Sequence, residues 1–328
     1  MNMFFEVAQI TASVPLLIFW GLVIGLIYST VGAAGGILAS VGLITIFGIQ
    51  DANLIKPMAQ SLTLITPLIA VPLYMRQCRV VYTLAALLGV GGIAGALIGS
   101  TLSSIWLSDM TIFKPVFAGL VFLIAAQMAW QLLGRSQEKE ALTHTMRAAE
   151  CFEKHVKDGG KECDLGVKLR RVSFSSFVIE FGKQVFTFNP LLPFFAGMTI
   201  AIVSSALGVG GGFLLVPFMS IVMKFPMHII AGTSALAITL HSITSIANYM
   251  RIGVELDYQL LGLLMIGIVI GSIAGPLISR WIPDKGLRGL LSVILFFISA
   301  RYSDLILGKQ GSETSVSNIG EFCSANEF

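Results

Sequence analysis

Two glycine-rich segments hold the residues whose types and spacing could bind a ligand. Gly32-Ala-Ala-Gly-Gly36 and Gly208-Val-Gly-Gly-Gly212 each lie inside a long run without Asp, Glu, Lys or Arg. Glycine costs a helix interior about 1 kcal/mol relative to alanine, so clustered glycine predicts a helix break. Backbone N–H groups freed at a break converge on anions. We therefore predict substrate-binding positions at Gly32, Gly35, Gly36, Gly208, Gly211 and Gly212, with close helix packing through small residues as the alternative.

Hydroxyl and amide side chains begin two of the apolar spans. Gln60 and Ser61 open one span, and Thr233 and Ser234 open the other. Such side chains can donate hydrogen bonds to an oxyanion and reorient at little cost. They can equally cap a helix or bond back to a helix carbonyl. We include all four among the predicted substrate-binding residues, and both interpretations stay open.

Four further residues are candidates for coupling or gating. Arg76 and Arg251 each follow a Tyr-Met pair, where they either anchor a helix at the membrane interface or attract anions into two vestibules. His241 and Asn248 lie inside an uncharged span, and an intramembrane ionisable residue is a functional hypothesis by default. His241 could carry a proton or be a hydrogen-bonded packing residue. The matched position of the first half is Leu68.

Nothing in the sequence forms a catalytic constellation. P-loop, HExxH, CxxC and nucleophile-elbow patterns do not occur, so we predict no enzyme, no catalytic residue and no cofactor. His144, His155, Cys151 and Cys163 match no zinc spacing, so no metal site is predicted. Cys78, Cys151, Cys163 and Cys323 are interpreted as free thiols, with a Cys151–Cys163 disulfide as the alternative.

The composition predicts an all-α, polytopic transmembrane bundle. Hydrophobic residues make up 55% and charged residues 12% of the chain, against about 25% charged in a soluble domain. Uncharged runs of the length of a span, about 20 residues, recur along the chain and predict about 8 spans plus half-helices. The runs after Glu6 and after Lys183 are too long for one helix, so each must hold two membrane-penetrating pieces. The net charge of +3 gives no reason to expect nucleic-acid binding.

The chain divides into two membrane halves around a polar insert. We predict a first repeat over 1–134, an insert over 135–189, a second repeat over 190–307 and a disordered tail over 308–328. Within the insert, residues 137–157 are predicted as an amphipathic helix, and alternating apolar residues between 172 and 188 predict a β-hairpin around Gly182-Lys183.

The two halves resemble one another at four places in the same order. Ser29 to Leu38 matches Ser205 to Leu214, Gln60-Ser-Leu62 matches Thr233-Ser-Ala235, Tyr74-Met-Arg76 matches Tyr249-Met-Arg251, and Gly91 to Ile98 matches Gly271 to Ile278. Duplicated halves with helices broken at matching positions are typical of secondary transporters. We favour inverted repeats. Lys and Arg fall at both ends of the spans, so the positive-inside rule does not decide the orientation. For Gly91, Gly95, Gly271 and Gly275, GxxxG spacing predicts helix packing.

The glycine segments resemble the TauE/SafE family of sulfite and organosulfonate exporters. The resemblance rests on Gly208-Val-Gly-Gly-Gly-Phe-Leu-Leu-Val-Pro217 and Gly232-Thr-Ser-Ala-Leu236, with weaker first-half copies at Gly32 to Leu38 and Gln60-Ser-Leu62. The first copy departs from the pattern at Ala33 and Ala34 and has no match for Pro217. The resemblance implies a multi-pass permease of the cytoplasmic membrane that exports a small sulfur-containing anion such as sulfite or an organosulfonate. An importer, an anion channel and a membrane-embedded thiol sensor or enzyme are the alternatives.

Overall fold

The computed structural model describes residues 2–31, 35–133, 167–172, 177–181, 184–225, 227–278, 293 and 295–297. The chain forms two compact units, of which the first comprises residues 1–109 and 136–284 and the second residues 110–135 and 285–328. The second unit contains helix α5 (Met110–Leu133), whose Phe122 ring lies 5.7 Å from that of Phe296. The cavity and both helix breaks discussed below belong to the first unit.

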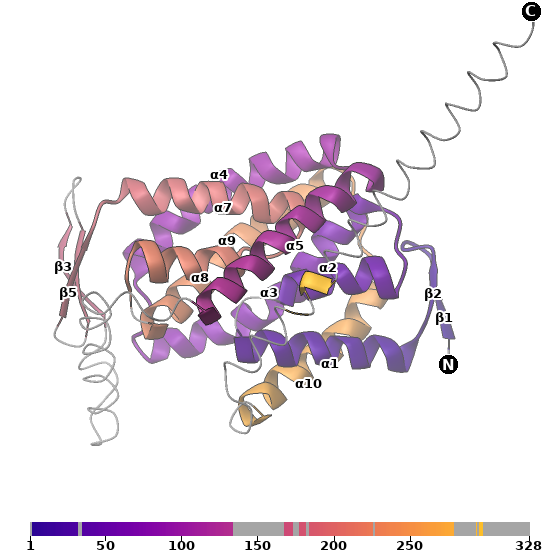
Figure 1. Ribbon diagram of the computed structural model, residues 1–328, viewed down its shortest axis with the longest axis horizontal. Helices are drawn as coiled ribbons and strands as arrows, with labels where there is room; N and C mark the ends of the chain where they lie inside the picture. Colours follow the sequence, from indigo (N-terminus) through magenta and orange to yellow (C-terminus); the bar gives the residue numbers. More distant parts are fainter. Residues whose placement is uncertain are drawn as a thin grey trace, which may run out of the picture. The chain divides into compact units, whose positions relative to one another are not determined.

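Helices of two repeated sets make up most of the first unit (Figure 1). The first set is α1 (Val14–Val31), α2 (Gly35–Val41) with the π-helical turn η1 (Gly42–Ile46), α3 (Ala52–Arg76) and α4 (Tyr82–Trp106). The second is α7 (Leu191–Leu207), α8 (Gly212–Pro217) with the π-helical turn η2 (Phe218–Val222), α9 (Met227–Arg251) and α10 (Tyr258–Ile278). The expectation of two pieces within each long uncharged run is confirmed, because α1 is followed by α2 and α7 by α8.

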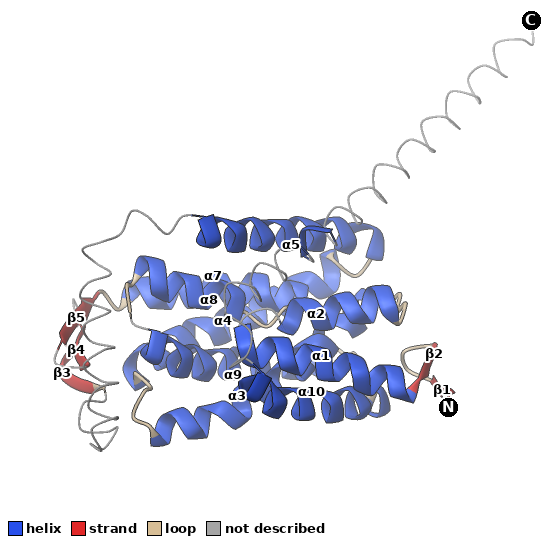
Figure 2. Cartoon of the chain, turned by 60° about the horizontal axis from the view of Figure 1, so that its bottom comes forward, coloured by secondary structure: helices blue, strands red, loops and turns tan. Residues whose placement is uncertain are grey.

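Two small β-elements mark opposite ends of this unit (Figure 2). At one end, β1 (Asn2–Phe5) pairs with β2 (Ile10–Ser13), a hairpin that the sequence patterns did not predict. At the other end lies a sheet of β3 (Lys168–Val172), β4 (Phe177–Phe181) and β5 (Gln184–Phe188). Antiparallel β4 and β5 confirm the predicted hairpin. The predicted helix over 137–157 and the tail over 308–328 lie outside the described residues.

The sheet is attached to the helices through apolar packing. Ile179 and Phe181 of β4 are fully buried in a cluster with residues of α4 and α9. The backbone N–H of Val167 donates to the carbonyl of Cys78 in the loop between α3 and α4, at 3.0 Å. The β3–β5 end of the unit is therefore also the end where α3 stops and α4 begins.

Glycine packing joins the two repeats along parallel helix pairs. The Cα positions of Gly91, Gly95 and Gly99 on α4 face the backbones of Phe194, Met198 and Ile202 on α7, in the same order. Gly21 and Gly25 of α1 face Leu264 and Ile268 of α10 in the same way, and Gly271 faces Leu22. Small residues let helix backbones approach this closely. The packing predicted for Gly91, Gly95 and Gly271 is confirmed.

Equivalent helices of the two repeats run in opposite directions. Gly232, near the start of α9, lies against Tyr74 at the end of α3. Asn248, near the end of α9, donates to Ser100 of α4 at 2.7 Å. The same end of α4 accepts a hydrogen bond from Asn53 at the start of α3, since Asn53 Nδ2 lies 3.3 Å from the carbonyl oxygen of Ser104. The repeats are therefore inverted, as expected.

The apolar helices fit a membrane-embedded bundle. Among the described residues, four helices are long and apolar enough to cross a membrane, namely α3, α4, α5 and α9. Five shorter apolar helices accompany them, including the paired pieces on either side of the two breaks. The predicted class, a helical membrane bundle with little sheet, is confirmed. The predicted repeat boundaries at residues 134 and 189 stay predictions.

We predict that Gly95→Leu destabilises the protein far more than Gly262→Leu. A side chain at Gly95 would collide with the Met198 carbonyl of α7, whereas a Cβ at Gly262 of α10 meets nothing within 4 Å. Overpacking of this kind costs about 1–3 kcal/mol. The melting temperature of the purified protein in detergent should fall for Gly95→Leu only. Equal melting temperatures for the two variants would contradict the parallel α4–α7 packing.

Candidate functional site

The second glycine segment breaks its helix inside the protein. Helix α7 ends at Leu207 and α8 begins at Gly212. Gly208, Gly210 and Gly211 have φ of +74°, +80° and +62°, a left-handed backbone that other L-residues rarely adopt. All of residues 207–213 are buried. The predicted helix break is therefore present, and it does not face lipid.

Backbone hydrogen bonds at this break are only partly made. The Val209 amide donates to the Ser204 carbonyl at 3.1 Å, and the Gly212 amide donates to Gly210 at 2.7 Å. The amides of Gly210 and Gly211 donate to no atom of the residues described. Lipid cannot satisfy such groups, so they need protein, water or a ligand. Two amides are thus available at the start of the half-helix.

Polar side chains from three helices surround Gly210 and Gly211. A Cβ built on Gly210 would lie 2.8 Å from Thr63 Oγ1 of α3. A Cβ built on Gly211 would lie 2.7 Å from His241 Nε2 of α9 and 3.3 Å from Ser204 Oγ of α7. Within the described part of the chain, both nitrogens of His241 and the Ser204 hydroxyl lack a hydrogen-bond partner. The structure therefore brings His241 and the second glycine segment together.

The first glycine segment contacts the second. Helix α1 ends at Val31 and α2 begins at Gly35, while the predicted site residue Gly32 lies outside the described residues. Gly35 lies against the Tyr28 ring, and Gly36 lies directly against the Val209 backbone. Both are fully or nearly fully buried in α2. Helix α2 therefore packs directly against the second glycine segment in the interior of the unit.

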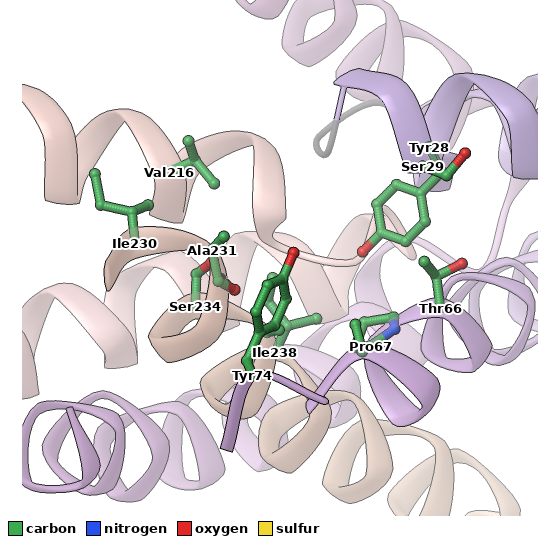
Figure 3. Close-up of a pocket in the computed structure, with 12 residues that line it drawn as sticks. Tyr28, Ser29, Thr66, Pro67, Tyr74, Val216, Ile230, Ala231, Ser234 and Ile238 are labelled. Carbon is green, nitrogen blue, oxygen red and sulfur yellow. Dashed lines mark hydrogen bonds between the residues drawn. The ribbon is translucent and has the colours of Figure 1, made fainter. Parts of the chain in front are cut away.

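A cavity of about 230 Å³ lies beside this meeting point (Figure 3). Residues of α1, α3, α8 and α9 line it. Its polar lining consists of hydroxyl groups, from Tyr28, Ser29, Thr66, Tyr74 and Ser234. None of the lining residues that the structure describes is charged. Figure 3 shows the Tyr28 and Tyr74 hydroxyls pointing into the space between their helices. At roughly 30 Å³ per water, the cavity has room for a small ion with some of its hydration.

Only one of the predicted side-chain donors lines this cavity, namely Ser234. Gln60 Nε2 donates to the Ser204 carbonyl at 3.1 Å, next to the second break. Ser61 Oγ bonds back to the Pro57 carbonyl at 2.8 Å, and Thr233 Oγ1 accepts the Val81 amide at 3.1 Å. Tyr28, Thr66 and Tyr74 were missed as site residues. For Tyr74 the sequence did hold an indication, because a tyrosine, Tyr249, stands at the equivalent position of the second repeat.

The predicted gating residues occupy different environments. Arg76 and Arg251 are exposed in the last turns of α3 and α9, at opposite ends of the unit because these helices are antiparallel. Asn248 is buried and donates to Ser100 Oγ at 2.7 Å and Thr101 Oγ1 at 2.9 Å. His241 is buried with 3% exposure. The structure thus separates the two arginines from the interior pair.

Lys56 is a buried lysine, and its place between two uncharged runs of the sequence gives no sign of this burial. Its side chain is fully buried in the first turns of α3. The Lys56 ammonium donates to the carbonyls of Ser103 at 3.2 Å and Leu107 at 2.7 Å, at the end of α4. A cation there satisfies the free carbonyls of a helix C-terminus. Lys56 therefore joins α3 to α4.

The interpretation of the cysteines as free thiols is wrong for Cys78, which is disulfide-bonded. Spacing along the chain did not reveal this, because Cys78 is far in sequence from the other cysteines. The other three cysteines, together with His144 and His155, lie outside the described residues. Among the residues that are described, no group of three or more potential metal ligands occurs.

Inverted repeats, matched helix interruptions and a cavity between them define an integral membrane protein of the inverted-repeat transporter class. The family model described as "Sulfite exporter TauE/SafE" matches residues 17–302, so the chain belongs to the TauE/SafE family. The resemblance seen at the glycine segments is thereby confirmed, and the protein is a membrane transporter of sulfur-containing anions. No curated protein and no solved structure matches the chain.

We predict that Lys56→Met lowers the stability of the protein. The Ser103 and Leu107 carbonyls would lose the ammonium that they accept, and an unsatisfied buried group costs about 1–3 kcal/mol. Lys224→Met, which removes an exposed lysine after η2, is the control. Thermal unfolding in detergent should show a lower midpoint for Lys56→Met alone. A Lys56→Met midpoint equal to that of the control would show that the contact adds nothing.

Proposed function

We propose that the protein is a secondary permease that exports a small sulfur-containing anion, such as sulfite or an organosulfonate, across the cytoplasmic membrane. The observation that carries the proposal is an uncharged, hydroxyl-lined cavity next to two contacting helix interruptions. Membership of the TauE/SafE family supports the substrate class. The proposed function is transport without enzymatic activity, and it requires no catalytic residue, cofactor or metal.

Neutral donors suit an anion that must be released as well as bound. Hydroxyls such as those of Tyr28, Tyr74 and Ser234 can each donate one hydrogen bond to an oxyanion. A lysine or arginine in the same apolar site would hold the anion far more tightly, because the attraction between charges grows as the dielectric falls. A site lined by hydroxyls therefore favours turnover over retention.

The proposed substrate-binding set keeps the residues predicted from the sequence and adds the cavity. It comprises Gly32, Gly35, Gly36, Gln60, Ser61, Gly208, Gly211, Gly212, Thr233 and Ser234, together with Tyr28 and Tyr74. The free amides of Gly210 and Gly211 support the glycine part of this set. We assign gating to His241 and Asn248, and attraction of anions at the two ends to Arg76 and Arg251.

Membrane potential can drive export without a coupled ion. Moving one charge through 100 mV is worth about 2.3 kcal/mol, which favours outward movement of an anion from a cell that is negative inside. Alternating access then needs only a neutral site that faces each side in turn. The inverted repeats support this mechanism, because each half can adopt the conformation of the other.

The experiment that tests the proposal is flux through the purified protein in liposomes. Sulfite, ethanesulfonate, thiosulfate and chloride are offered in turn under an inside-negative potential. We expect movement of at least one sulfur anion and trans-stimulation by the same anion on the far side. A sample that moves none of the four contradicts the anion assignment, and flux without trans-stimulation identifies a channel.

We predict that Gly211→Leu reduces this flux by at least about tenfold. The new side chain would meet His241 and Ser204 at a backbone with φ of +62°, and a cost of about 1.4 kcal/mol is tenfold in occupancy. Gly262→Leu, where a Cβ meets nothing within 4 Å, is the matched control. Correct folding of both variants is checked by size-exclusion chromatography in detergent before reconstitution. Full transport by a well-folded Gly211→Leu variant would remove this glycine from the site.

A further inference from the structure

The residues that line the cavity have repeat counterparts elsewhere in the unit. The repeat alignment matches Ser29 with Ser205, Tyr74 with Tyr249, Ser234 with Ser61 and Val216 with Ser40. Three of these four pairs are identical residue types. Because the repeats are inverted, the counterparts lie toward the β1–β2 end, where α3 begins and α9 ends. The unit therefore holds the parts of a second, oppositely directed lining.

This second lining is closed in the present conformation. Ser29 and Tyr74 are partly exposed in the cavity, whereas their counterparts Ser205 and Tyr249 are both 0% exposed. Ser40 is also 0% exposed. Three of the four pairs are therefore asymmetric, with the cavity residue partly exposed and its counterpart fully buried, whereas Ser234 and Ser61 are both buried, at 3% and 9% exposure.

Many polar atoms in the closed region lack partners. In the described chain, the hydroxyls of Ser40, Ser204 and Ser205, Gln60 Oε1 and both nitrogens of His241 make no hydrogen bond. All five side chains are at least nine-tenths buried. Burying a polar group without a partner is unfavourable. Such a concentration is unexpected in a permanent core and is explained if these groups meet a ligand in another conformation.

Hydrogen bonds to the last turn of α7 hold this region closed. Three successive carbonyls there accept bonds from three different helices. Gln60 Nε2 of α3 donates to Ser204, Ser103 Oγ of α4 to Ala206 at 2.6 Å, and Tyr249 of α9 to Ser205 at 3.0 Å. Tyr249 is the counterpart of Tyr74, whose hydroxyl points into the open cavity (Figure 3). Release of these bonds would free the last turn of α7.

We propose that Ser40, Ser61, Ser205 and Tyr249 line a second anion vestibule, which opens toward the β1–β2 end when the cavity of Figure 3 closes. It takes the same small oxyanion, held again by hydroxyl donors. This inference rests on the proposed permease function. The second vestibule differs from the first where Ser40 replaces Val216 and Ser204 replaces Tyr28. The two faces of the carrier therefore offer the anion different donors.

Cysteine labelling of repeat-equivalent positions tests the second vestibule. Ser29→Cys and Ser205→Cys variants in liposomes are exposed to a membrane-impermeant methanethiosulfonate from either side, with the chain lacking a new cysteine as background. Ser29→Cys should be labelled from one side, and Ser205→Cys only slowly. Adding Tyr249→Phe removes the bond to the Ser205 carbonyl, so labelling of Ser205→Cys should rise about fivefold, from the opposite side.

Tyr74→Phe is the matched control, because it removes the equivalent hydroxyl of the open cavity and should not speed labelling of Ser205→Cys. Ser61→Cys, on α3, should repeat the pattern of Ser205→Cys and replaces it if that variant does not fold. Labelling of both new cysteines from the same side as Ser29→Cys would overturn the second vestibule. So would labelling that does not respond to Tyr249→Phe.

Ethanesulfonate flux through the same liposomes separates this inference from the proposed function. If ethanesulfonate is transported but the methanethiosulfonate labels neither Ser205→Cys nor Ser61→Cys, the second vestibule is contradicted and the permease assignment stands. Two-sided access in a protein that moves none of the four anions contradicts the permease assignment and leaves the second vestibule in place. Flux together with two-sided access supports both.

Discussion

The fold depends on one constraint, namely that backbone groups freed by a helix break must be satisfied within the protein. The break between α7 and α8 is therefore internal, and Gly36 of α2 lies against its Val209. The last turn of α7 receives side-chain donors from α3, α4 and α9. These polar contacts fix the register of α3, α4 and α9 against α7, which apolar packing alone would specify less strictly. The break organises the helices around it.

The same constraint gives the interior its chemistry. A region that must supply hydrogen-bond donors and acceptors to backbone groups outside a helix is polar without being charged. Such a region can bind an anion in place of water. The described charge in this area, Lys56, is committed to the carbonyls at the end of α4. The cavity itself is lined by hydroxyls. Lys56 thus satisfies the end of α4, while neutral groups face the cavity.

Glycine has two separate roles in this chain, and backbone conformation distinguishes them. Gly95 and Gly271 stay helical and allow close approach of a neighbouring backbone. Gly208, Gly210 and Gly211 have positive φ and end a helix. Spacing separated the two roles for these residues, because GxxxG places glycines on one helix face whereas adjacent glycines destabilise the helix itself. Gly35 and Gly36, predicted at a break, instead lie within α2, where Gly36 packs against the Val209 backbone.

The sequence by itself determined the helical membrane class, the duplication, the break between α7 and α8 and the β4–β5 hairpin, since each is a local or periodic pattern, whereas helix contacts in the structure showed that the repeats are inverted. Only the tertiary structure decided which side chains meet. Tyr28 of α1, Thr66 and Tyr74 of α3 and Ser234 of α9 line one cavity because these three helices pack together. The burial of Lys56 and the disulfide of Cys78 likewise depend on contacts between distant segments. No pattern along the chain encodes such contacts, because the residues involved are tens to hundreds of positions apart.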